Sequence, residues 1–172
     1  MPQSVPAKHG PARYASYVEI HKSVIGQLIG QGFVAFDETK FTFLTREMVL
    51  LFGHLGCSGG IVVGVEKYLQ VCGELDGSPL VQTAQYSYNV WLQGGYNLLR
   101  YDNSHVHRGH ADEHHKHEFD WRTGVELSHS PICIGASAWP TLGEVLHEVR
   151  DWYYANAMLL PPDAPSLNKL RI

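Results

Sequence analysis

The chain has 172 residues, of which 44% are hydrophobic and 17% are charged, and this composition favours one globular domain over a fibrous repeat or a disordered chain. Its 13 Lys and Arg against 17 Asp and Glu give a formal charge of -4, so no overall positive field attracts nucleic acid or anionic lipid. Any contact of that kind must come from a local patch.

Cysteine usage and hydropathy favour a cytoplasmic protein. The three cysteines, Cys57, Cys72 and Cys133, have no CxxC spacing, which argues against a disulfide framework and against a thiolate zinc site. No apolar run approaches the ~18 residues of a membrane span, and residues 1–13 lack the apolar stretch of a signal peptide. We therefore expect no membrane contact.

The hydrophobic pattern predicts one folded domain over residues 14–160, between loose Pro-rich tails at 1–13 and 161–172. Apolar positions at helical spacing predict a short N-terminal helix near residues 18–30. Three strand-like runs follow it, at residues 33–36, 41–44 and 48–52.

A long β-hairpin is the clearest local feature of the pattern. Residues 61–71 and 80–91 alternate between apolar and mixed positions, as expected of strands with one buried face. Between them, Asp76-Gly77 is a dipeptide that favours a tight hairpin turn. The two runs therefore predict neighbouring antiparallel strands.

One more strand and a helix complete the expected fold. Residues 96–101 follow a Gly-Gly turn and continue the series of strands. Thr141 and Glu144 have the spacing of a capping box, and apolar residues recur at helical spacing through 141–157. We expect an α+β domain: an antiparallel β-meander of five or six strands, with the C-terminal amphipathic helix packed on one face and a short N-terminal helix.

Histidines are concentrated in one segment of the chain. Six of the 11 lie between residues 105 and 117, far more than random placement would give. The segment is internal and interrupted by other residues, so an expression tag is a poor explanation. The six are His105, His107, His110, His114, His115 and His117.

Motifs around this segment resemble those of a known family. They are Tyr-Ser-Tyr at 86–88, Tyr-Asp-Asn at 101–103, His-His-Lys-His at 114–117 and Trp-Pro-Thr-Leu-Gly-Glu-Val-Leu at 139–146. In these motifs the chain resembles the TumE-type family of prokaryotic toxin-antitoxin proteins, loosely over residues 60–153. The resemblance implies a cytoplasmic toxin that is paired with a helix-turn-helix antitoxin and acts on RNA. The oligomeric state is not indicated.

Residue chemistry also allows RNA cleavage. Attack by the 2'-hydroxyl needs a base and an acid, and two imidazoles can supply both. His115 and His117 are the expected pair, because residues i and i+2 of an extended segment lie on one face, whereas His114 and Lys116 lie on the other. Asp102 could orient one imidazole, as a carboxylate does for a catalytic histidine.

Three residues are candidates for binding the RNA substrate. Lys116 and Arg108 are cations next to the histidines, so they could bind phosphate. Tyr101 could stack on a base. The protein would then act as a ribonuclease without a cofactor.

The same segment also supports a metal-dependent hydrolase. Imidazoles together with Asp102 or the acidic residues nearby suit zinc, manganese, nickel or iron, and three protein ligands with an open position can activate water. His-Glu-x-x-His is absent, so spacing does not select the ligands. The candidate metal ligands are His105, His107, His110 and His114.

Two non-enzymatic hypotheses remain open. The histidine loop could hold a metal or a protein partner without turnover. It could also be a solvated polar surface without a specific ligand. The sequence therefore leaves open whether the protein is an enzyme.

Overall fold

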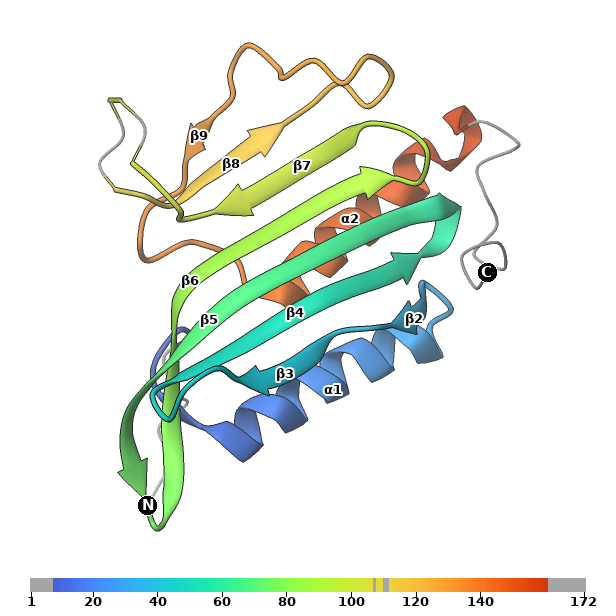
Figure 1. The fold of residues 1–172 in the computed structure, drawn as a ribbon. Coiled ribbons are helices and arrows are strands. Elements are labelled where there is room, and N and C mark those ends of the chain that lie inside the picture. The colour runs from blue at the N-terminus through green and yellow to red at the C-terminus, as the bar shows by residue number, and fades with distance from the viewer. Residues whose placement is uncertain (1–7, 107, 110–111, 161–172) are drawn as a thin grey trace, which may run out of the picture.

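The structure, a computed structural model, describes residues 8–106, 108–109 and 112–160. Nine strands of this part of the chain pair into one antiparallel sheet, with two α-helices packed against it (Figure 1). The predicted α+β class, with a helix at each end of the domain, is confirmed. The predicted C-terminal tail, 161–172, and the candidate ligands His107 and His110 lie outside the described residues.

The strand order across the sheet is β2-β4-β5-β6-β7-β8-β9, with β1 paired to β6 and β3 paired to β4. Neighbouring strands follow one another in sequence from β4 to β9, as in the predicted meander. The strands are β1 (Ala12–Arg13), β2 (Val34–Asp37), β3 (Lys40–Phe43), β4 (Met48–Cys57), β5 (Ile61–Leu75), β6 (Ser78–Leu92), β7 (Asn97–Asp102), β8 (His115–Glu118) and β9 (Ile132–Cys133).

The β5–β6 hairpin is the centre of the sheet. Its register runs from Ile61 opposite Leu92 to Leu75 opposite Ser78. At the turn, Asp76 and Gly77 both have positive φ, 51° and 74°, as a two-residue hairpin turn that follows the strand twist requires. The turn dipeptide thus sets the register of the longest strand pair.

Both α-helices cover the same face of the sheet. Helix α1 (Tyr14–Gly30) buries Ile25 and Leu28, and α2 (Leu142–Asn156) buries Val145, Leu146 and Val149. These side chains share one core with inward-facing strand residues, among them Val63, Val65, Tyr88 and Val90. Short 3-10 turns lie at Ser58–Gly60 and Ala157–Leu159. Neither α1 nor α2 covers the opposite face of the sheet, which we call the open face.

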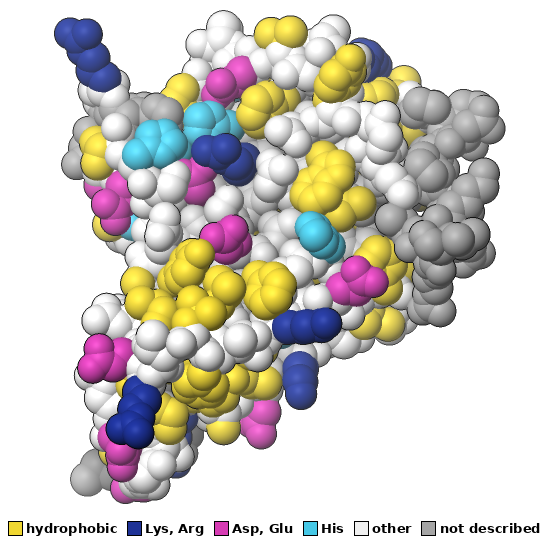
Figure 2. Space-filling view, viewed as in Figure 1, with side chains coloured by type: hydrophobic (Ala, Val, Ile, Leu, Met, Phe, Trp, Pro, Cys, Tyr) yellow, Lys and Arg dark blue, Asp and Glu magenta, His cyan; other side chains and the backbone are white. Residues whose placement is uncertain are grey.

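Figure 2 shows this open face. Histidine side chains gather where β7 and β8 meet the loop between them, beside basic and acidic side chains. The candidate site therefore lies on the face opposite to α1 and α2.

The sheet has more strands than the five or six predicted. The additional strands are β1 and β9, which have two residues each, and β8, which lies in the histidine segment. Two-residue strands carry no alternation, and β8 is polar on both faces, so the hydrophobic pattern missed all three. In the predicted N-terminal tail, 1–13, residues Ala12 and Arg13 pair with Val81 and Leu80 of β6.

Replacing Thr141 by Ala is expected to lower the free energy of unfolding by about 1 kcal/mol, measured by urea unfolding. Thr141 Oγ1 accepts a hydrogen bond of 3.3 Å from the Glu144 backbone N–H, and the Glu144 carboxylate accepts one of 2.7 Å from the Thr141 N–H. Thr141→Ser keeps the acceptor and is the control. An unchanged stability of Thr141→Ala would contradict a contribution from this cap.

The three cysteines differ in accessibility, and all are free thiols. Cys57 is fully buried, and burial raises the pKa of its thiol to about 12, whereas Cys72 and Cys133 are exposed. Because the thiolate is the reactive form, we expect a thiol reagent to label two cysteines in the folded protein and the third only after unfolding. Rapid labelling of Cys57 in the folded protein would show that this part of the core opens.

Neither helix of the described residues combines the length and the apolar character needed to cross a membrane.

Candidate metal centre

Strands β7 and β8 place the site residues on opposite faces of the sheet. Asp102 pairs with His115 across the two strands, and Tyr101 pairs with Lys116. Side chains alternate along a strand, and the Tyr101 hydroxyl donates a hydrogen bond to Glu148 of α2. Asp102 and His115 therefore point to the open face, whereas Tyr101 and Lys116 point to the helices.

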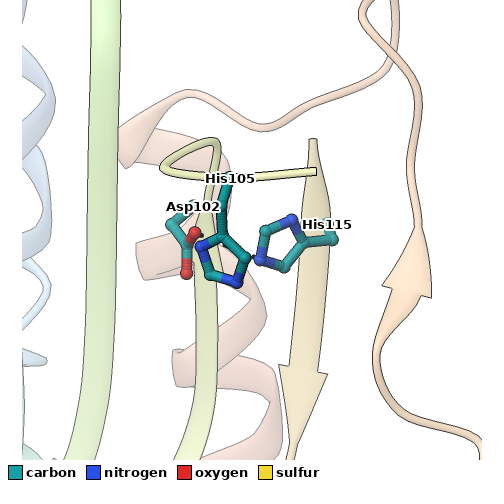
Figure 3. A group of neighbouring side chains, drawn as sticks. All are labelled: Asp102, His105 and His115. Atoms are coloured by element: carbon teal, nitrogen blue, oxygen red, sulfur yellow. Dashed lines mark ion pairs between the residues drawn. The ribbon is translucent and has the colours of Figure 1, made fainter. Parts of the chain in front are cut away.

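Asp102, His105 and His115 form a group that could hold a metal ion. Each offers one ligand atom, and these atoms lie within 4.8 Å of one another. Asp102 ends β7, His105 lies in the loop that follows, and His115 begins β8, so the three side chains point toward one another (Figure 3). The sequence predicted His105 as a metal ligand, His115 for acid/base chemistry, and Asp102 either to orient an imidazole or to join the imidazoles at a metal.

The surroundings of Asp102 keep its carboxylate charged. Ser104 donates to Asp102 Oδ1 from its backbone N–H at 3.1 Å and from its hydroxyl at 2.7 Å, and Arg100 Nε donates to Oδ2 at 2.6 Å. Burial by itself raises the pKa of Asp102, but these hydrogen bonds and the charge of Arg100 outweigh it and lower the pKa below its usual value. The group thus contains an anionic oxygen ligand at neutral pH.

The ring of His115 is oriented as in many metal-bound histidines. Its Nδ1 lies 2.7 Å from the carbonyl oxygen of Glu113, and a carbonyl can only accept, so Nδ1 carries the hydrogen. In the neutral ring, Nε2 then carries the lone pair, and it lies 3.1 Å from Asp102 Oδ1. A backbone carbonyl on the second ring nitrogen commonly fixes the tautomer of a metal ligand.

His117 lies beside this group on the open face. The ring centroids of His115 and His117 are 4.9 Å apart, and His117 Nδ1 lies 2.6 Å from Glu126 Oε1. His117 is 8% exposed, whereas His115 is fully buried. The predicted acid/base pair is thus brought together, with His117 as its more accessible member.

His114 lies on the opposite side of β8. Its ring stacks on Trp139 at a centroid distance of 5.4 Å and on Tyr86 at 5.7 Å. Its backbone N–H donates to the carboxylate of Asp112 at 2.9 Å. The structure therefore places His114, a predicted metal ligand, in the packing of the helix-covered face.

Lys116 and Tyr101, the predicted substrate-binding residues on these strands, both contact Glu148. Lys116 Nζ lies 2.7 Å from Glu148 Oε1 and also pairs with Glu118, and the Tyr101 hydroxyl lies 2.8 Å from Glu148 Oε2. They are separated from the metal-ligand group by the sheet. Arg108, the third predicted residue, is exposed in the loop between β7 and β8.

Lys116→Met is expected to lower the free energy of unfolding by about 1–3 kcal/mol. Burial alone lowers the pKa of Lys116, but its carboxylate partners outweigh this effect and raise it, which reflects a stabilising ion pair. Urea unfolding measures the effect. An unchanged stability of Lys116→Met would contradict a contribution from these ion pairs.

A small polar pocket adjoins the metal-ligand group. Its volume is about 180 Å³, and Asp102 and Ser104 form part of its wall. The sequence did not single out Arg100, although it lies two residues before Asp102 on one strand and so must share its face. The side chains that line the pocket include Glu66, Tyr68, Ser87, Arg100, Asp102 and Ser104.

The chain matches no family model, no curated protein and no solved structure.

Proposed function

We propose that the protein is a metal-dependent hydrolase that cleaves phosphodiester bonds in RNA. The observation that carries the proposal is the convergence of Asp102, His105 and His115, whose ligand atoms lie within 4.8 Å of one another. Two imidazoles and one carboxylate suit zinc, manganese, nickel or iron. Three protein ligands leave at least one position for water, which a bound metal ion activates at neutral pH.

Residues around the group have roles in this reaction. His117, whose ring centroid lies 4.9 Å from that of His115, is the imidazole next to the group and is the residue that can move a proton in this reaction. Arg100, whose side chain is 38% exposed at the pocket, can bind a phosphate oxygen. The resemblance to TumE-type toxins supplies the substrate class, RNA, and a partner, a helix-turn-helix antitoxin.

A metal-free ribonuclease is the second candidate. The 4.9 Å between the rings of His115 and His117 favours it, since both a base and an acid would be at hand. Complete burial of His115 disfavours it, because a general base must come within hydrogen-bond reach of the substrate hydroxyl. We therefore rank the metal-dependent reaction first.

Metal removal and return separate these candidates. Full-length protein is treated with EDTA, dialysed, titrated with Zn²⁺, Mn²⁺ or Ni²⁺ by calorimetry, and assayed on a single-stranded RNA. We expect one ion per chain, no cleavage after EDTA, and recovery with one of the metals. Cleavage that persists in EDTA but is lost in His117→Ala would favour the metal-free ribonuclease. Tight metal binding without cleavage of any RNA would favour a non-catalytic binding protein.

A further inference from the structure

A second and larger cavity lies on the helix-covered side of the sheet. Its volume is about 570 Å³, and it is bounded by α1, the segment 8–13 and the β5–β6 hairpin, with the start of α2 at one side. That volume is within the range of pockets that hold a small organic ligand, ~300–1,000 Å³. Its apolar lining includes Ile20, Val24, Ile25, Leu51, Leu80 and Leu142.

Lys67 of β5 is a buried cation in the wall of this cavity. It is 6% exposed, and its Nζ donates a hydrogen bond to the Tyr17 hydroxyl. The same Nζ lies 5.1 Å from the centre of the Tyr17 ring and 6.0 Å from that of Tyr88. The Tyr17 hydroxyl oxygen, which accepts this hydrogen bond, favours the charged form of the ammonium group.

Lys67 has no carboxylate partner among the described residues that line the cavity. Among the described residues, three cations line the cavity, Lys8, Arg13 and Lys67, and no carboxylate does. Lys8 pairs with Glu144 at 2.8 Å and Arg13 pairs with Asp76, but no described carboxylate forms an ion pair with Lys67. Burial alone lowers the pKa of Lys67, yet its contacts with Tyr88 and Tyr17 raise it above its usual value.

Burial of an ammonium group without a carboxylate partner is costly, and an anion next to it offsets that cost. A carboxylate that enters the cavity can accept hydrogen bonds from Lys67 and Tyr17. Its carbon chain can then lie against the apolar wall that α1 and β6 provide. The cavity therefore offers a cation for the carboxylate and an apolar wall for the carbon chain.

We propose that this cavity binds a small amphipathic carboxylate, with its charged end at Lys67 and its carbon chain along α1. The site is independent of the metal-ligand group, because Lys67 faces the helices whereas Asp102 and His115 face the open side of the sheet. Failure of one proposal therefore leaves the other intact.

Calorimetry of the full-length protein with octanoate and 1-octanol tests the proposal. We expect one octanoate to bind per chain. The affinity for 1-octanol should be lower by at least about tenfold, because the alcohol lacks the charged group that accepts a hydrogen bond from Lys67. Lys67→Met should lower the affinity for octanoate by about tenfold or more and leave the affinity for 1-octanol unchanged. The proposal would be overturned if Lys67→Met bound octanoate as tightly as the wild type does, or if the wild type did not bind octanoate.

A second pair of variants tests the proposal without altering a buried residue. Ser16 is exposed on α1 and lines the cavity. Ser16→Glu should lower the affinity for octanoate several-fold, because its carboxylate repels that of the ligand, whereas the neutral Ser16→Gln should not lower it. Metal affinity, measured in the same variants, should equal that of the wild type. Equal octanoate affinity of the Glu and Gln variants would contradict a charged end near this wall.

Discussion

We expect Asp102→Asn and His115→Ala each to lower the affinity for a divalent transition metal by at least about 100-fold and, under the proposed function, to abolish RNA cleavage. Loss of a residue that merely supports a metal ligand already costs ~10–100-fold in affinity, so loss of a ligand costs more. Asp102→Asn removes the anionic oxygen and keeps the shape of the side chain. His115→Ala removes the imidazole whose orientation Glu113 determines. Calorimetric titration with Zn²⁺ and single-turnover RNA cleavage measure the two effects.

His129→Ala is the matched control for these variants. His129 is also a histidine that lies next to a carboxylate, since its Nε2 lies 2.6 Å from Glu118 Oε2. Its side chain is 56% exposed, and it is not part of the metal-ligand group. Its replacement should leave metal affinity and cleavage unchanged. If His115→Ala binds the metal as tightly as His129→Ala does, the assignment of the centre is wrong.

Trp139→Ala is expected to lower the free energy of unfolding by about 3–5 kcal/mol, the usual cost of truncating a buried aromatic residue. Trp139 is 5% exposed, and its ring stacks on three others, those of His9 at 3.4 Å, Tyr86 at 4.5 Å and His114 at 5.4 Å between centroids. It therefore joins the N-terminal segment, the sheet and the histidine segment. Urea unfolding followed by circular dichroism measures the loss.

Two variants calibrate this measurement. Trp139→Phe keeps an aromatic ring in the stack and should lose less than half as much stability as Trp139→Ala. Met158→Ala removes a side chain that is 97% exposed, and its effect should be within about 0.5 kcal/mol of zero. A loss of under about 1 kcal/mol in Trp139→Ala would mean that this stack contributes little to the packing.

Local patterns were sufficient to predict much of the architecture. The Asp76-Gly77 dipeptide and the alternating runs around it predicted the β5–β6 hairpin, because both signals depend on residues adjacent in the chain. Thr141 and Glu144 predicted the start of α2 for the same reason, since a capping box closes within one turn of helix. Alternation along a strand also explains why His115 and His117 share a face that Lys116 does not.

The sequence indicated the segment that carries the site but only part of the arrangement of its side chains. A polar strand such as β8 has no hydrophobic alternation, so its pairing with β7, and hence the contact between Asp102 and His115, was not visible in the sequence. The preference for Lys116 and Tyr101 as substrate ligands rested on closeness along the chain. Both residues instead contact Glu148, 32 and 47 residues away in sequence.

The sequence by itself determined both α-helices and the strands other than β1, β8 and β9, because hydrophobic spacing, turn dipeptides and caps act over a few neighbouring residues. Only the tertiary structure decided which histidines meet a carboxylate and which cation is buried in a cavity. Those contacts depend on strand register and on helix packing, which bring together Asp102, His105 and His115 on one face and Lys67 with Tyr17 on the other. Register and packing minimise the free energy of the whole chain, which no short stretch of sequence specifies.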